Sequence, residues 1–210
     1  MTTLSAQEKD TLAQRIKTLE LQTDGEMVMV ITPYSDHYRY ICAAYAAMLA
    51  LVTPLFLTHW WGLIGDAYGV FCAQVFVFCV LLAIFQIWPV RRLLVTRSVM
   101  HSRAKKMAHE LFFMQNVHHK TQRNAIMLFV SEAERYVEVL ADRDMAECVS
   151  SDVWQSIVDE FIQCVCEGNV FDGYSGAIER CGALLIDAFP VTQENEDELP
   201  NHLIEWHWQQ

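Results

Sequence analysis

The feature that most constrains this fold is an apolar stretch, residues 40–90, in which Asp66 is the only side chain charged at neutral pH. Asp66 divides the stretch into two blocks of about 20 residues, 41–61 and 69–88. A helix of that length crosses a hydrocarbon core of about 30 Å. Two buried helices of a soluble protein are the alternative. Both blocks are apolar on every face, however, and aromatic residues gather at their ends, as they do at membrane interfaces: Trp60, Trp61, Tyr68 and Trp88. The pattern favours a transmembrane hairpin.

The distribution of basic residues orients this hairpin. Arg39 precedes the first block, the connection at 62–68 contains no Lys or Arg, and a basic group follows the second block. The positive-inside rule therefore places both termini in the cytoplasm. The hairpin begins too late, and lacks the basic start and cleavage pattern, to be a signal peptide. We expect the basic group to face the anionic headgroups of the bilayer. It consists of Arg91, Arg92, Arg97, Arg103, Lys105 and Lys106.

Charge and cysteine content exclude several classes of function. The formal net charge is −11, so nucleic acid, which is itself negative, is not an expected partner. The seven cysteines have no framework spacing, and the Cys164–Cys166 pair has no second close pair with which to bind a metal. Reduced thiols in a cytoplasmic domain are the better interpretation.

The rest of the chain alternates helical and strand patterns. Residues 27–31 and 125–130 are short apolar runs typical of strands covered on both faces, and 135–141 alternates as a half-exposed strand joined to the second run by a tight turn. Helices are predicted for 4–21, which begins with a Ser5–Glu8 capping box, and for 97–117. A third helix is capped by Ser150 or Ser151 and ends at Gly168, and a loop at 169–176 leads to a last helix at 177–189. The stretch 97–117 would then continue the second membrane helix, and 199–208 would dock on the domain. Residues 1–38 and 96–210 are expected to form one discontinuous domain around a hairpin at 39–95.

The order of these signals resembles the TPM-domain family, in its membrane-bound bacterial branch. The resemblance rests on TDGEMVMVI at 23–31, NAIMLFVSEAERYVEVLAD at 124–142, Trp154, the GxxxAI-like pattern at 173–178, and ELPNHLI at 198–204. It implies an α/β fold, a three-layer α/β/α sandwich with a mixed sheet, here interrupted by the hairpin. It also implies a bacterial inner-membrane location, and, as in some members, weak phosphatase activity and calcium binding.

Sheet topology ranks the candidate site residues. A right-handed crossover would make the first two strands parallel, and the third would return antiparallel. Glu132 and Glu134 would then lie at one end of the sheet, where pairing with the basic group is expected. Glu26, Asp142 and Asp144, with Glu147 nearby, would lie at the other end. Oxygen ligands of this kind suit Ca²⁺ or Mg²⁺, and the alternative, carboxylates that cap backbone amides, is the favoured interpretation.

Two functions of different class follow from these features. The first is a membrane-anchored module that binds or assembles other membrane proteins at the cytoplasmic face. The second is a weak, metal-assisted phosphatase at the acidic edge. The sequence contains no P-loop, GxGxxG or GxSxG motif, and no phosphatase nucleophile motif, which favours the first.

Overall fold

The computed structural model describes residues 4–61, 67–114, 124–191 and 203–206. The chain divides into two compact units, Met1–Ser35 with His101–Gln210, and Asp36–Met100. Among the described residues, the first unit contains four strands and most of the helices. The second contains α2 (Arg39–Trp61), α3 (Ala67–Phe85) and α4 (Trp88–Leu94). Helix α5 (Arg97–Met114) begins in the second unit and ends in the first.

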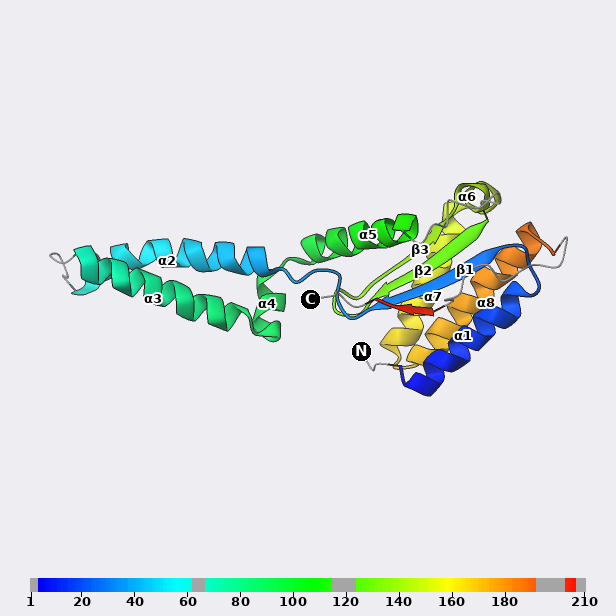
Figure 1. The fold of residues 1–210 in the computed structure, drawn as a ribbon, viewed down its shortest axis with the longest axis horizontal. Coiled ribbons are helices and arrows are strands. Elements are labelled where there is room, and N and C mark those ends of the chain that lie inside the picture. The colour runs from blue at the N-terminus through cyan, green and yellow to red at the C-terminus, as the bar shows by residue number, and fades with distance from the viewer. Residues whose placement is uncertain (1–3, 62–66, 115–123, 192–202, 207–210) are drawn as a thin grey trace. The chain divides into compact units, whose positions relative to one another are not determined.

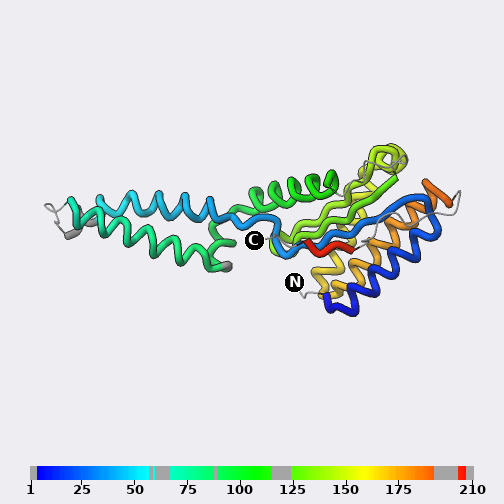
Figure 2. Tube along the Cα trace, in the orientation of Figure 1, coloured from blue at the N-terminus to red at the C-terminus, as the bar shows by residue number. Residues whose placement is uncertain are grey.

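A mixed sheet organises the first unit. Strands β1 (Glu26–Thr32), β2 (Ala125–Ser131), β3 (Tyr136–Ala141) and β4 (Leu203–Glu205) lie in the order β3-β2-β1-β4. Strand β1 is parallel to both β2 and β4, and β3 is antiparallel to β2. In Figure 2 the short β4, in red, lies beside β1, in blue. The predicted parallel pair and the tight hairpin are therefore confirmed. The C-terminal segment docks as β4, a short strand that needs β1 as its partner.

Helices cover both faces of the sheet, which confirms the three-layer sandwich. Helices α1 (Ala6–Glu20), α7 (Ser151–Cys166) and α8 (Val170–Ala188) lie on one face, and α5 lies on the other (Figure 1). Side chains of a strand alternate between faces, so Met27, Met29 and Ile31 meet the first layer while Val28 and Val30 meet α5. Every residue of β2 is buried, which explains why the central strands have apolar side chains on both faces.

Helix α1 forms as its sequence predicts. The Ser5 hydroxyl accepts from the Glu8 amide at 3.3 Å, and Glu8 Oε2 accepts from the Ser5 amide at 2.7 Å. Leu12, Ile16 and Leu19, which share one face, are buried in the core.

Helix α8 begins earlier than expected, at Val170 rather than 177. The sequence from Asn169 to Gly176 has the glycines and small polar residues of a loop, and the loop prediction was wrong. Packing on α7 explains the difference, since Tyr174 lies edge-on to Phe161 with ring centroids 4.9 Å apart. Gly173 has no side chain to separate the helices, and an added Cβ would lie 3.2 Å from Cys164 Cβ.

The second unit is a helical hairpin. Cys42, Ala46 and Phe85 form a small buried cluster against which α3 and α4 residues pack. Helices α2 and α3 are long and apolar enough to cross a membrane over Arg39–Phe56 and Ala67–Phe85, and only 17% and 6% of these spans are buried. They therefore do not resemble the core helices of a soluble protein. Asp66 and the side chains of Trp60, Trp61 and Trp88 lie outside the described part of the structure, as does the acidic tail 194–198.

Helix α5 does not continue α3, contrary to expectation. Helix α3 ends at Phe85, and α4 starts anew with Pro89 in its first turn. A proline interrupts a helix because it lacks the amide hydrogen and its ring clashes with the preceding turn, but it is tolerated in a first turn. The chain is extended at Val95 before α5 begins.

Candidate functional site

The predicted acidic edge is partly assembled by the sheet. Glu26 is in register with Ala125, and the Asp142 amide donates to the Ala125 carbonyl at 2.8 Å. Glu26 and Asp142 therefore reach the same end of the sheet. Asp144 and Glu147 lie on α6 (Arg143–Cys148), a short helix that the sequence pattern did not predict.

Two carboxylates of this edge have structural contacts. Asp142 is buried and is the N-cap of α6, and it accepts from the Arg143 amide at 2.7 Å. Glu147 pairs with Arg143 one turn earlier on the exposed side of α6, at 3.2 Å. Among the described residues, no group of three or more His, Cys, Asp or Glu side chains is arranged to hold a metal ion. Capping, the alternative named above, is what the structure describes for Asp142, and metal binding at this edge stays a prediction.

The opposite end of the sheet holds a buried carboxylate, Glu134. Both of its oxygens accept from the Ser35 amide at 3.1 Å, and it also accepts from the Ser131 hydroxyl. The Ser35 hydroxyl donates to Ser131 Oγ at 2.8 Å. Glu134 thus joins the segment that follows β1 to the turn between β2 and β3. Because a charge-assisted hydrogen bond is stronger than a neutral one, this contact fixes the loops at the carboxyl ends of the parallel strands.

A second group of titratable side chains lies at this same end. Burial raises the pKa of Glu132, Lys9 opposes the rise, and the negative charge of Glu205 adds to it. Lys9 and Glu205 form an ion pair at 2.7 Å. The phenol of Tyr174 is buried, and its pKa is raised by burial and then by the charge of Glu132. Ligands of open α/β sheets bind at the carboxyl ends of the strands, so this group of side chains is a candidate site. Its Glu132 carboxyl group holds a proton more tightly than an ordinary glutamate does, because its pKa is raised.

Sequence reasoning missed most of this group because its members come from four separate segments. Lys9 lies on α1, Glu132 in the β2–β3 turn, Tyr174 on α8 and Glu205 on β4. The available signal was the position of Glu132 directly after a buried strand; the other three needed the packing of both terminal segments on the sheet.

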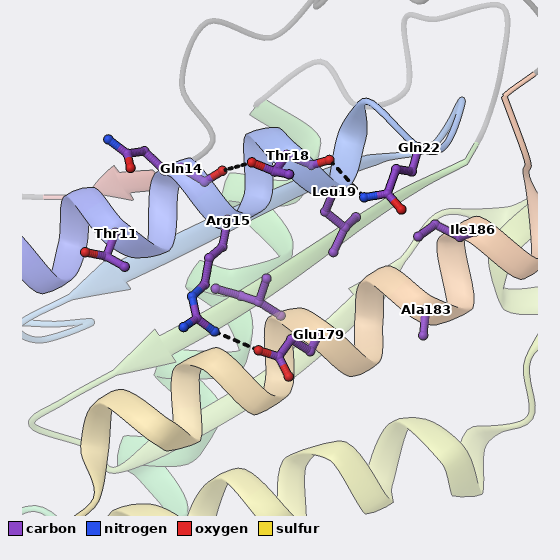
Figure 3. Close-up of a pocket in the computed structure, with 10 residues that line it drawn as sticks. Thr11, Gln14, Arg15, Thr18, Leu19, Gln22, Glu179, Ala183 and Ile186 are labelled. Atoms are coloured by element: carbon purple, nitrogen blue, oxygen red, sulfur yellow. Dashed lines mark hydrogen bonds and ion pairs between the residues drawn. The ribbon is translucent and has the colours of Figure 1, made fainter.

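A groove runs between α1 and α8 on the outer side of the first helix layer (Figure 3). Its volume is about 510 Å³, and Arg15 and Glu179 bridge it at 2.7 Å. The helices approach closely at Gly182, where an added Cβ would lie 1.7 Å from Leu19 Cδ1. The groove therefore combines an apolar floor with a polar wall of α1 side chains. Its lining residues include Thr11, Gln14, Thr18, Gln22, Leu19, Ile178, Ala183 and Ile186.

Two histidines of α5, His101 and His109, contact residues of β3. The ring centroids of His101 and Tyr136 are 5.5 Å apart, and His109 Nε2 lies 3.6 Å from Glu138 Oε1. The Tyr136 hydroxyl donates to Glu138 Oε2 at 3.0 Å. These contacts join the exposed side of α5 to an edge strand.

The predicted basic group is divided between two helices. Arg91 and Arg92 lie on α4, and the other four residues, Arg97, Arg103, Lys105 and Lys106, lie on α5. Arg91 has protein partners. Its guanidinium donates to the His37 carbonyl at 3.0 Å and to the Gln86 carbonyl and side-chain oxygen at 2.9 Å. Lys106 pairs with Glu110 at 3.6 Å, whereas Arg92 and Arg97 are exposed.

All seven cysteines are free thiols. Cys181 is buried between helices and sheet, and burial raises its pKa to about 12. A thiol with so high a pKa is a poor nucleophile at neutral pH, so Cys181 has a packing role.

Comparison with known proteins identifies the fold. The family model for the TPM domain matches residues 91–184, which confirms the resemblance inferred from the sequence. No curated protein matches the chain. The NMR structure of the BA42 protein from the psychrophilic bacterium Bizionia argentinensis is similar, with a TM-score of 0.59 and 16% identity, covering 97% of this chain and 95% of that one. This likeness shows a shared fold.

Proposed function

Because the chain carries a TPM domain, we propose that it is a membrane-anchored binding module that assembles with other membrane proteins at the cytoplasmic face of a bacterial inner membrane. The observation that carries the proposal is the apolar hairpin placed between two parts of one α/β/α domain in the sequence. A hairpin at that position tethers the domain at the membrane while both chain ends remain free to fold on one sheet.

The outward faces of the hairpin support membrane insertion. Among the described side chains, Met48, Leu51 and Leu55 of α2 and Phe71 and Phe76 of α3 each expose 60% or more of their surface. Exposed apolar area costs about 25 cal/mol per Å² in water, and a lipid bilayer removes this cost. The side chains at the ends of the sheet that are buried, Glu134 and Asp142, have structural partners, which favours binding over catalysis.

The α1–α8 groove is the proposed contact surface for a partner protein. It lies on the outer helix layer, its floor is apolar, and one ion pair bridges it. Interfaces combine an apolar centre with a polar rim in this way.

Copurification of the intact protein tests the proposal. Membranes would be solubilised in a mild detergent, and partners identified by mass spectrometry for the wild type, for Thr18→Arg and for Gln155→Arg. Thr18 lies in the groove, and an arginine there should remove the partners. Gln155 is exposed on α7 outside the groove, so Gln155→Arg is the matched control and should retain them. Recovery of no membrane protein above the background of an unrelated two-helix protein would contradict the binding function.

A weak metal-assisted phosphatase activity is the second candidate. It is supported by the convergence of Glu26 and Asp142 at one end of the sheet. Ca²⁺ or Mg²⁺ bound there would relieve repulsion between carboxylates. Divalent-cation-dependent turnover of a phosphate monoester that is lost in Asp142→Asn, together with a melting temperature raised by Ca²⁺ in the wild type, would establish it. Turnover and melting temperature both indifferent to the cations would eliminate it.

A further inference from the structure

We propose that the base of the hairpin binds the headgroups of anionic phospholipids through three exposed arginines, Arg39, Arg92 and Arg97. This inference rests on the proposed membrane insertion and adds the lipid class that the protein selects. The base surface consists of these arginines with Ile87 and Leu93, and all five residues belong to the unit Asp36–Met100.

The turn from α3 into α4 creates this surface. Helix α3 closes with hydrogen bonds from the amides of Gln86 and Ile87 to carbonyls three residues earlier, at 3.2 and 3.1 Å. Val90 and Leu94, one turn apart on α4, pack against the buried Cys42–Ala46–Phe85 cluster. The other side of α4 therefore faces outward. Leu93 on that side is 87% exposed, the highest value among the large apolar residues in the described part of the chain.

The four arginines of this unit differ in their contacts. Arg91 is held by the His37 carbonyl and by Gln86, so it closes the hairpin and contributes little to lipid binding. Arg39, Arg92 and Arg97 are exposed, and they make no hydrogen bond or ion pair with any residue that the structure describes. Three cations without protein partners remain available for a ligand.

The charge balance of the unit favours an anionic ligand. Its sequence contains four arginines and two acidic residues, Asp36 and Asp66. The Asp36 carboxylate accepts a hydrogen bond from the Tyr38 amide at 3.0 Å. Asp66 lies between the two apolar blocks in the sequence. Guanidinium groups bind phosphate oxygens in a bidentate geometry. Leu93, which follows Arg92 in the chain and is exposed, gains free energy by entering the acyl boundary of the same bilayer. A phospholipid offers both the phosphate and the acyl chains.

Lipid titration of the full-length protein in a neutral detergent tests the inference. Phosphatidylglycerol or phosphatidylcholine would be added, and the lipid concentration that gives half of the rise in melting temperature would be measured. One basic residue near an anionic surface contributes about a fivefold gain in affinity. We expect the wild type to prefer phosphatidylglycerol by a factor on the order of 100 and the triple variant Arg39→Gln, Arg92→Gln, Arg97→Gln to lose that preference. The preference should also weaken at 0.5 M NaCl because salt screens the charges.

Four controls separate the possible outcomes: two variants, inorganic phosphate and alkaline extraction. The triple Arg→Lys variant keeps the charges and should retain most of the preference, whereas Arg135→Gln, at an exposed arginine of the β2–β3 turn, should leave it unchanged. Equal responses of the wild type to the two lipids, or a triple Arg39→Gln, Arg92→Gln, Arg97→Gln variant that responds as the wild type does, would overturn the inference. An equal rise with inorganic phosphate alone would also overturn it. Alkaline extraction of membranes decides insertion separately: a wild-type protein released by carbonate contradicts the proposed function itself.

Discussion

At the scale of single residues, two glycines of α8 have opposite roles. Gly182 faces Leu19 of α1, and an added Cβ would lie 2.5 Å from Leu19 Cγ. Gly176 has no atom within 4 Å of the corresponding position. The first glycine allows the close approach of two helices, while the second only adds flexibility to the unfolded chain.

We therefore predict opposite effects for the two alanine substitutions. Gly182→Ala should lower the free energy of unfolding by about 1–2 kcal/mol, because overpacking costs more than the gain in helix propensity. Gly176→Ala should raise it by about 0.5–1 kcal/mol. Denaturant unfolding of both variants checks this, and a stabilising Gly182→Ala would show that α1 and α8 are not packed as described.

Glu132 gives a pH-dependent prediction. Its pKa in the folded protein is raised above the ordinary value of 4.5, chiefly by burial. The folded protein then holds this proton more tightly than the unfolded chain does. The associated stability is present below the unfolded-state pKa and is lost as the pH rises through the folded-state pKa. The melting temperature of Glu132→Gln minus that of the wild type should therefore increase as the pH rises from 4 to 7. A difference in melting temperature that does not change with pH would contradict the raised pKa of Glu132.

At the scale of elements, the local sequence pattern predicted the helices and strands whose own residues carry an uninterrupted apolar, alternating or capping pattern. The buried strands β1 and β2, the β2–β3 hairpin and the capped helix α1 all follow from apolar runs, alternation or capping residues. The first turns of α8 did not, because Gly173 and Ser175 look like loop residues until α7 is packed against them. Helix α6 was missed for a related reason, since it is only six residues long and depends on the Asp142 cap. The candidate site was predictable only at Glu132, Glu26 and Asp142, which adjoin strands.

Strand β4 is the element whose contribution is easiest to isolate. It pairs with β1 through Met29, Val30 and Ile31, and the Trp206 amide donates to the Ile31 carbonyl at 3.0 Å. Ending the chain at residue 202 should lower the free energy of unfolding by at least about 2 kcal/mol, because apolar contacts of Ile204 and Trp206 with the α5 layer are lost and the edge of β1 is bared. The truncated chain should also aggregate more readily, since a bare strand edge pairs with other chains. Equal stability of the full and truncated chains by denaturant unfolding would show that β4 is dispensable.

At the scale of the whole molecule, two units of different surface chemistry share one chain. The unit Met1–Ser35 with His101–Gln210 buries its apolar residues on both faces of a sheet, and the unit Asp36–Met100 exposes them along two helices. The surface of the first unit is compatible with water, whereas the exposed apolar side chains of the second unit are more stable in the hydrocarbon of a bilayer. The proposed function follows from this division, with the domain in the cytoplasm and the hairpin as its anchor.

Accessibility of single cysteines in intact cells tests that arrangement most directly. The seven native cysteines would first be replaced, and one cysteine then introduced at Asp66, in the connection of the hairpin, or at Ser5, at the start of α1. A hairpin with both termini inside predicts that a membrane-impermeant thiol reagent labels the cysteine at position 66 from outside the cell. The same reagent should label the cysteine at position 5 only after the membrane is opened. Labelling at position 5 in intact cells, with position 66 protected, would contradict the cytoplasmic placement of the domain.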